Sequence, residues 1–191
     1  ADWGDMDGDG DLDLVVSGLI KAGEVNEPRT IVFENEGDDE FAPLGAGLIG
    51  VREGDVAWGD YTGDGALDLV VAGRANSAPL ARTILYRNNG DGTFTQAFAP
   101  LNGVREADVA WGDYNGDGNL DLVVTGENRS ESASTTIYKN QNGRLRALDE
   151  DLTGVDRGSV DWGDYDGDGD LDLLVSGTPL ISSTRDRVTT V

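Results

Sequence analysis

The stretch WGDYDGDGDLDLLVSG, residues 162–177, places five aspartates at alternate positions and then continues directly into an apolar run. Three close copies begin at Trp3, Trp58 and Trp111, and all four tryptophans of the chain occupy the first position of this repeat. A sequence that repeats with a period of about 50 residues indicates a solenoid, a propeller or another array of structural units. A residue that recurs in every unit favours a structural role over a single active site.

Each unit contains four short runs with the alternating pattern of β-strands, separated by turn signals. In the second unit these runs are residues 54–60, 67–73, 82–88 and a shorter run through Phe94. In the second run Leu69 and Val71 point one way and Val70 the other, so this strand should be buried on both faces. Asn89-Gly90 predicts a tight hairpin between the third and fourth runs.

Four antiparallel strands in every repeat predict an all-β fold built from β-propeller blades. A β-solenoid has much shorter coils, and a separate sheet of ~50 residues could not bury both of its faces. The expected blade units are 1–54, 55–107, 108–157 and an incomplete 158–191, about 3.75 blades in one partial propeller over residues 1–191. Closed propellers have about four to eight blades. We therefore expect an arc, or a ring completed by self-association with a second copy or by residues outside this chain.

The aspartates of the opening stretch have the spacing of a calcium-binding loop. Counted from Asp164, side-chain oxygens stand at positions 1, 3, 5 and 9, position 7 can offer its carbonyl, and position 6 is glycine. Hard oxygen ligands at alternate positions around a sharp turn are typical of calcium coordination. The loop is not an EF-hand, because position 12 is valine and strand-like runs flank it. Position 9 lies in the apolar run, so a buried strand anchors the last ligand.

A solvated acidic turn is the alternative interpretation of each loop. Carboxylates that converge to ~4 Å repel each other by up to about 4 kcal/mol per pair at an effective dielectric constant of about 20. Four such loops would strongly destabilise one small protein unless cations neutralised them. We therefore expect calcium in the loops.

The four copies resemble the FG-GAP/VCBS-type repeats of integrin α-subunit propellers and of many bacterial exported proteins. The resemblance covers the whole chain and implies a β-propeller, often seven-bladed, with calcium between the first and second strands of each blade. The phenylalanine-glycine and Gly-Ala-Pro signatures of integrin repeats are absent, so the chain is more similar to the bacterial branch. The resemblance therefore implies an extracellular, periplasmic or cell-surface location.

By position, the resemblance implies up to four calcium ions and their ligands. The first loop supplies Asp5, Asp7, Asp9, Asp11 through its carbonyl, and Asp13; the second supplies Asp60, Thr62, Asp64, Ala66 through its carbonyl, and Asp68. The third supplies Asp113, Asn115, Asp117, Asn119 through its carbonyl, and Asp121; the fourth supplies Asp164, Asp166, Asp168, Asp170 through its carbonyl, and Asp172. Thr62 departs from the usual aspartate or asparagine, so the second site should be the weakest.

The composition excludes several classes of function. The chain has no cysteine and no histidine, so it cannot form a thiolate site, the usual zinc sites or a Ser-His-Asp triad. A formal net charge of -23 argues against nucleic acid as a partner. No apolar run is long enough to span a membrane. We expect that the chain is not an enzyme.

Besides a purely architectural spacer, two binding functions remain for such a scaffold, and the sequence favours the first. One is a calcium-binding interaction or adhesion module of an exported or cell-surface protein. The other is a glycan-binding module attached to a secreted carbohydrate-active enzyme. A glycan site would use exposed aromatic side chains in variable loops. The connections 18–29, 73–82, 126–135 and 177–187 contain none.

The same connections, between the second and third strands of each unit, should form the binding surface. Successive loops of an up-and-down blade alternate between its two ends, so these connections lie opposite the calcium loops. They differ most between units, and function on a repeated scaffold usually lies where the repeats differ. The expected partner is a protein or an acidic glycan, and the candidate contact residues are Arg74, Arg129 and Arg185.

Overall fold

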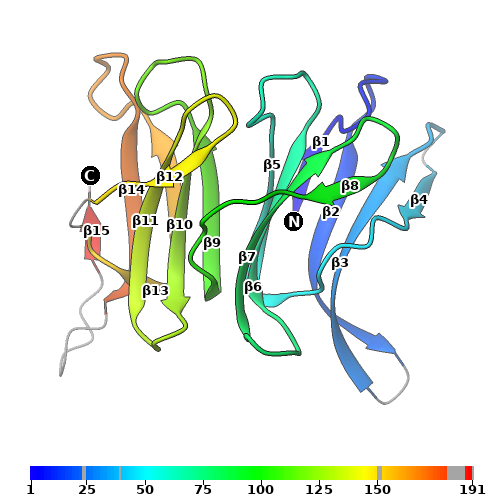
Figure 1. The fold of residues 1–191 in the computed structure, drawn as a ribbon, viewed down its shortest axis with the longest axis horizontal. Helices are drawn as coiled ribbons and strands as arrows, with labels where there is room; N and C mark the ends of the chain where they lie inside the picture. The colour runs from blue at the N-terminus through cyan, green and yellow to red at the C-terminus, as the bar shows by residue number, and fades with distance from the viewer. Residues whose placement is uncertain (23–24, 39, 150–151, 180–187, 191) are drawn as a thin grey trace.

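The protein is described by a computed structural model that covers residues 1–22, 25–38, 40–149, 152–179 and 188–190. All regular structure in these residues is β-strand (Figure 1). No helix in the described part is long and apolar enough to cross a membrane. The predicted all-β fold is confirmed.

The strands occur in four sets that follow the four sequence repeats. The first unit contains β1 (Asp2–Gly4), β2 (Asp13–Ala22), β3 (Val25–Asn35) and β4 (Phe41–Leu44). The second contains β5 (Arg52–Gly59), β6 (Asp68–Arg74), β7 (Ala81–Asn88) and β8 (Phe94–Gln96). The third contains β9 (Val104–Gly112), β10 (Asp121–Asn128), β11 (Ala133–Asn140) and β12 (Leu145–Ala147). The fourth contains β13 (Val155–Gly163), β14 (Asp172–Pro179) and β15 (Val188–Thr190).

Within each unit, consecutive strands pair antiparallel, as expected for a propeller blade. The second and third units are also joined by one backbone pair, Arg82 with Val104. The first unit differs from our expectation of a loop over 18–29. Its β2 and β3 continue as a paired hairpin to Ala22 and Val25, because the register set at Leu14 and Phe33 runs on through Leu19 and Pro28.

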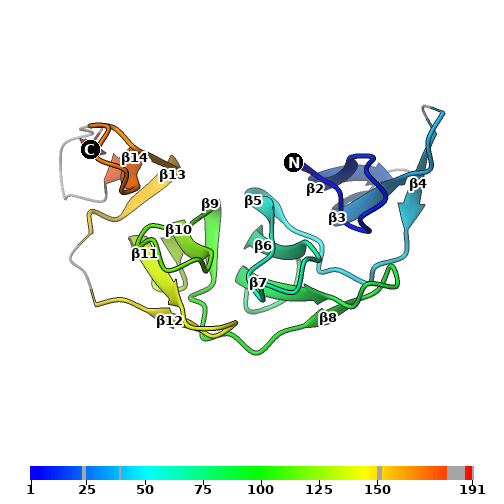
Figure 2. The same cartoon turned by 90° about the horizontal axis from the view of Figure 1, so that it is seen from above.

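Seen from above, the units follow an open arc (Figure 2). The first strands, β5 and β9, lie toward the inside of the arc, and the last strands, β8 and β12, lie on its outside. The described strands do not close into a ring. The first and fourth units therefore form the two ends of the arc.

The hydrophobic core lies between units and not within them. Val15 and Val32 of the first unit pack with Trp58 and Leu69 of the second. The opposite face of β6 presents Val70 to the third unit. A further cluster joins Val123 and Ile137 of the third unit to Val160 and Val175 of the fourth. The predicted two-sided burial of the second strand is thus confirmed for β6, whose residues 68–73 are all buried.

Asp55 on β5 lies near its counterpart in the third unit, and we expect it to destabilise the protein above pH 6. Burial, and then repulsion from Asp108, raise the pKa of Asp55 from 3.8 to about 6. Because the folded pKa lies above the unfolded value, the charged form costs stability, which is lost as the pH rises from about 4 to about 6. Asp55→Asn should add about 1–2 kcal/mol to the free energy of unfolding at neutral pH and little at pH ~4. Urea unfolding at the two pH values tests this, and an equal gain at both would contradict it.

Candidate metal centre

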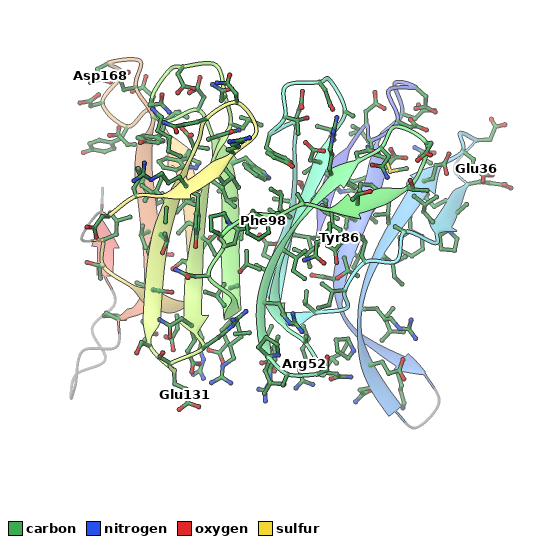
Figure 3. The ribbon with its side chains drawn as sticks, in the orientation of Figure 1. Glu36, Arg52, Tyr86, Phe98, Glu131 and Asp168 are labelled. Atoms are coloured by element: carbon green, nitrogen blue, oxygen red, sulfur yellow. The ribbon has the colours of Figure 1, made fainter. Side chains whose placement is uncertain are left out.

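The four acidic loops lie together at one end of the strands. They connect β1 to β2, β5 to β6, β9 to β10 and β13 to β14. Figure 3 shows Asp168 of the fourth loop at this end and Arg52 and Glu131 at the other. The loops thus occupy the predicted position between the first and second strands of each unit.

The first aspartate of each loop organises the backbone of that loop. Oδ1 of Asp60 accepts a hydrogen bond from Gly63 N at 2.8 Å, and Oδ2 accepts one from Gly65 N at 2.8 Å. Both oxygens of Asp5 and Asp164 accept the same two bonds, and those of Asp113 accept bonds from Asp117 N and Gly118 N. The sixth position has a φ between 84° and 97° in all four loops, which favours glycine there. The first aspartate and the sixth-position glycine of each loop therefore specify the turn that brings the ligand positions together.

The ninth-position aspartate is held on the second strand, as the sequence predicted. Asp13, Asp68 and Asp121 are each at most 1% exposed. One oxygen of each accepts a backbone hydrogen bond from an asparagine at the end of the third strand, at 2.7–2.9 Å. A buried carboxylate in this position is oriented before any ligand arrives.

In the first and fourth loops the carboxylates converge enough to hold a metal ion. Oxygens of Asp5, Asp7 and Asp13 lie within 4.8 Å of one another. Those of Asp164, Asp166 and Asp172 do the same. Burial raises the pKa of Asp7, partly offset by a hydrogen bond from the backbone of Asp9, and the neighbouring carboxylates raise it further. These two loops therefore each form an acidic cluster that could hold a cation.

The second and third loops form no such group of three carboxylates among the described residues. In the second loop, Arg87 of β7 donates a hydrogen bond to Asp64 at 2.8 Å and lowers the pKa of that carboxyl. In the third loop, Lys139 of β11 lies 3.4 Å from Asp117 and 3.2 Å from Asn115 Oδ1. Each of these loops thus has a basic side chain beside its fifth position.

Our sequence reasoning missed these basic residues, although a signal was present. The third strands end FEN, YRN and YKN, so the residue before the final asparagine is Glu34, Arg87 or Lys139. In the first unit, burial and then Asp7 and Asp13 raise the pKa of Glu34. One position on the third strand therefore adds negative charge to one loop and positive charge to two others.

The final asparagine of this motif, also missed, ties neighbouring loops together. Asn88 Nδ2 donates to the carbonyl of Met6 in the first loop at 2.7 Å and to Leu67 O at 3.1 Å. Asn140 Nδ2 makes the same pair of bonds to Tyr61 and Leu120. The position of one loop thus depends on the loop before it.

Asp68 provides a direct test of whether the second loop fits a cation. Its Oδ2 is buried without a hydrogen-bond partner, whereas the corresponding oxygens of Asp13 and Asp172 accept backbone N–H groups. Burial raises the pKa of Asp68 to about 6, and the charges of Asp64 and Asp60 contribute. A buried carboxylate oxygen without a partner is costly, and a cation would satisfy it. The donors of the second loop therefore fit a metal ion that prefers oxygen.

The end opposite the loops carries a mixed set of charges. Arg74 lies 3.4 Å from Glu53, and Arg105 pairs with Glu127 at 2.5 Å and not with the adjacent Glu106. Glu106 instead binds Arg157 of the fourth unit. Glu106, Glu127 and Asp156 form a third acidic group within 4.8 Å, which the sequence did not reveal, and Arg105 and Arg157 neutralise most of its charge.

The candidate contact residues lie partly in this region. Arg129 borders two pockets of about 280 Å³ and 240 Å³. Arg74 ends β6, the strand whose other end carries Asp68 of the second loop. Arg185 lies outside the described residues.

Comparison with known families agrees with the geometry. A model described as an FG-GAP-like repeat matches residues 5–71, 60–124 and 113–175, each match running from one acidic loop into the second strand of the next unit. Comparison with curated proteins gives no significant match. Since the three matches together extend from residue 5 to residue 175, the chain belongs to the family of FG-GAP-like repeat proteins.

Proposed function

We propose that this chain is a calcium-stabilised interaction module of an exported or cell-surface protein, without catalytic activity of its own. The observation that carries the proposal is the convergence of acidic oxygens in the loops, together with the unpartnered buried oxygen of Asp68. The absence of cysteine and histidine supports an oxygen-only ligand set. Adhesion is the form of interaction that we favour.

Calcium suits these loops better than magnesium or zinc. Calcium accepts six to eight oxygen ligands in a flexible geometry, whereas magnesium demands a near-ideal octahedron. Each loop offers carboxylate, hydroxyl or amide oxygens at positions 1, 3, 5 and 9. The carbonyls of Asp11, Ala66, Asn119 and Asp170 would complete the sets. Bound calcium would neutralise the carboxylates and brace the loops that join neighbouring units.

Calcium titration of an Arg87→Ala variant tests the metal proposal at its most informative site. The variant removes the guanidinium group that contacts Asp64. Calcium should then bind the second loop roughly five- to tenfold more tightly, because a positive charge a few ångströms away no longer repels the calcium ion. Isothermal titration calorimetry measures the change. Arg82→Ala is the matched control, because Arg82 lies on the same strand and bonds to Pro79 O at the other end.

Two outcomes would contradict this. Absence of calcium binding by the unaltered protein would remove calcium from the proposed function. An equal change in the Arg82→Ala control would show that net charge, and not the contact with Asp64, sets the affinity.

We place the partner surface on the end opposite the loops, where the connections between second and third strands differ most between units. The pockets beside Arg129 and the mixed charges around Arg74 support a protein or acidic-glycan partner. The described parts of these connections expose no aromatic side chain, so nothing favours a neutral-glycan module attached to a carbohydrate-active enzyme.

Retention on a column of heparin, a sulfated polysaccharide, tests this surface. We expect the column to retain the unaltered protein in calcium. The triple variant Arg74→Ala, Arg129→Ala, Arg185→Ala should elute at clearly lower salt, because guanidinium groups recognise the sulfate groups of heparin as they recognise phosphate. Calcium-dependent melting should be unchanged in the variant. If retention survives these changes but is lost on substitution of Asn89 and Asn142 in the hairpins, the functional face is the loop end.

A further inference from the structure

The third strands of the second and third units end at a buried asparagine that bonds to two acidic loops. Asn88 is 4% exposed and Asn140 is 0% exposed. The Asn140 side chain uses both ends of its amide. Oδ1 accepts a hydrogen bond from Gly143 N at 2.8 Å, and Nδ2 donates to Leu120 O at 3.0 Å and to Tyr61 O at 2.7 Å. A buried amide with these bonds is held in one orientation.

The bonds of Asn140 reach two different loops. Its backbone N–H donates at 2.7 Å to Oδ1 of Asp121, the ninth-position aspartate of the third loop. Tyr61 belongs to the second loop, where it stands between the first and third ligand positions, Asp60 and Thr62. Asn140 therefore connects the last ligand of one loop to the first ligands of the loop before it.

Asn88 makes the same connection one unit earlier. Its backbone N–H donates to Asp68 Oδ1 in the second loop at 2.9 Å, and its Nδ2 donates to Met6 O in the first loop at 2.7 Å. Met6 stands between the ligand positions Asp5 and Asp7. The first, second and third loops are thus joined in series by two asparagines.

The residue at the second position of the first and second loops also packs against the next unit. Tyr61 is 5% exposed and stacks on Trp111 of the third unit, with ring centroids 6.1 Å apart and ring planes 11° from parallel. Met6 is 3% exposed and lies in the cluster that includes Trp58 of the second unit. Neither loop can therefore move its first and third ligands without disturbing the unit that follows.

We propose that Asn88 and Asn140 couple the calcium sites of the first three loops, so that an ion bound in one loop favours binding in its neighbour. This inference rests on the proposed calcium function. An ion in the third loop would fix Asp121 and, through it, the strand end that carries Asn140. The Tyr61 carbonyl would then already be held, so the second loop would lose less conformational freedom on binding its own ion. Because coupling between sites is reciprocal, an ion in the second loop favours the third by the same factor.

Repulsion between ions in neighbouring loops acts against this coupling. Salt screens the repulsion, with a screening length of about 8 Å at an ionic strength of about 0.15 M. The hydrogen bonds of a buried asparagine are much less sensitive to salt. Measurements at this ionic strength or above therefore isolate the coupling that passes through Asn88 and Asn140.

Two-dimensional NMR during a calcium titration follows each loop separately. The backbone amides of Gly10, Gly65 and Gly118, at the sixth positions of the first three loops, donate to the first aspartates of those loops. Their signals should therefore report the ion in each loop. In the unaltered protein we expect the three signals to change together, and more steeply with calcium concentration than independent sites allow.

Asp117→Ala tests transmission from the third loop to the second, because it removes a ligand of the third loop alone. The midpoint of the Gly65 titration should rise about fivefold or more. In protein that also carries Asn140→Ala, which removes the bond to Tyr61, Asp117→Ala should move this midpoint less than twofold. Electrostatic effects of the lost carboxylate, including the release of Lys139, occur in both proteins and cancel in the comparison.

Asn89→Ala is the matched control, because the Asn89 side chain bonds to Thr93 and Thr95 within its own hairpin. In this variant Asp117→Ala should still shift the Gly65 midpoint about fivefold or more. Circular dichroism checks the fold of each variant, and the comparison of Asp117→Ala with the unaltered protein needs no change at Asn140.

Two results would overturn the coupling while calcium binding itself stands. One is independent titration of the three loops in the unaltered protein. The other is an equal effect of Asp117→Ala with and without the Asn140 side chain. If calcium changes none of the glycine signals, the proposed calcium function is overturned, and the coupling with it.

Discussion

Chelation of calcium should lower the melting temperature of this protein by roughly 10–20 °C. A site held at about 100 times its dissociation constant stabilises the fold by about 2.7 kcal/mol. For a chain of this size, each kcal/mol moves the melting temperature by about 2–4 °C. The estimate counts only the first and fourth loops, where three carboxylates already converge. Loss of their cations would leave those carboxylates to repel one another.

The measurement is thermal unfolding by circular dichroism in calcium, in EGTA, and in EGTA with sodium chloride at matched ionic strength. The salt control should recover little, because an exposed monovalent ion does not replace a coordinated divalent one. An unchanged melting curve in EGTA would contradict a stabilising role for calcium.

The pH dependence without calcium provides a second signature. Burial raises the folded pKa of Asp68 to about 6, above its unfolded value near 3.8. Without metal, stability from this group should therefore fall as the pH rises from about 4 to about 6. Calcium should remove this fall, because the bound ion favours the charged carboxylate.

Trp58→Ala should lower the free energy of unfolding by about 3–5 kcal/mol. Trp58 is 8% exposed and packs in the core between the first two units with Leu69 and Val71. Its loss would leave a cavity at the point where the units meet. Because a single unit cannot bury its own core, the damage should extend to the docking of the whole first unit.

Trp3→Ala is the control for this change, since it removes the same residue from the same position of another repeat. Trp3 is 55% exposed and touches Phe41 at its edge, with ring centroids 6.0 Å apart. Its substitution should cost less than about 1 kcal/mol in dilute, monomeric protein. Urea unfolding of both variants measures the difference, and equal losses would show that the repeat position and not the packing between units sets the cost.

Local spacing was sufficient to predict most of the strands and the position of the acidic loops. The alternation of Leu69, Val70 and Val71 predicted a strand buried on both faces, and the structure buries all three. The glycine at the sixth position of each loop predicted a sharp turn. The structure has a positive φ at this position, which explains why the residue is glycine. These features depend on residues a few positions apart, which a sequence displays directly.

Contacts between strands that are far apart in the sequence could not be predicted in this way. Arg87 reaches Asp64 and Glu106 binds Arg157 because separate strands fold next to one another. The number of converging carboxylates, by contrast, follows from the sequence, because the third position is aspartate in the first and fourth loops but Thr62 and Asn115 in the other two. The hairpin of β2 and β3 was likewise missed, because its strands extend by pairing with each other and carry little signal of their own.

The glycine after each tryptophan shows the distinction most clearly. In the sequence, Gly59 reads as part of a turn-rich motif. In the structure it lies at the end of a strand, and its lack of a side chain accommodates the indole of Trp111 from the next unit. The motif determined where each blade begins. Close packing between blades, which involves atoms about one repeat apart in the chain, determined why the residue is glycine.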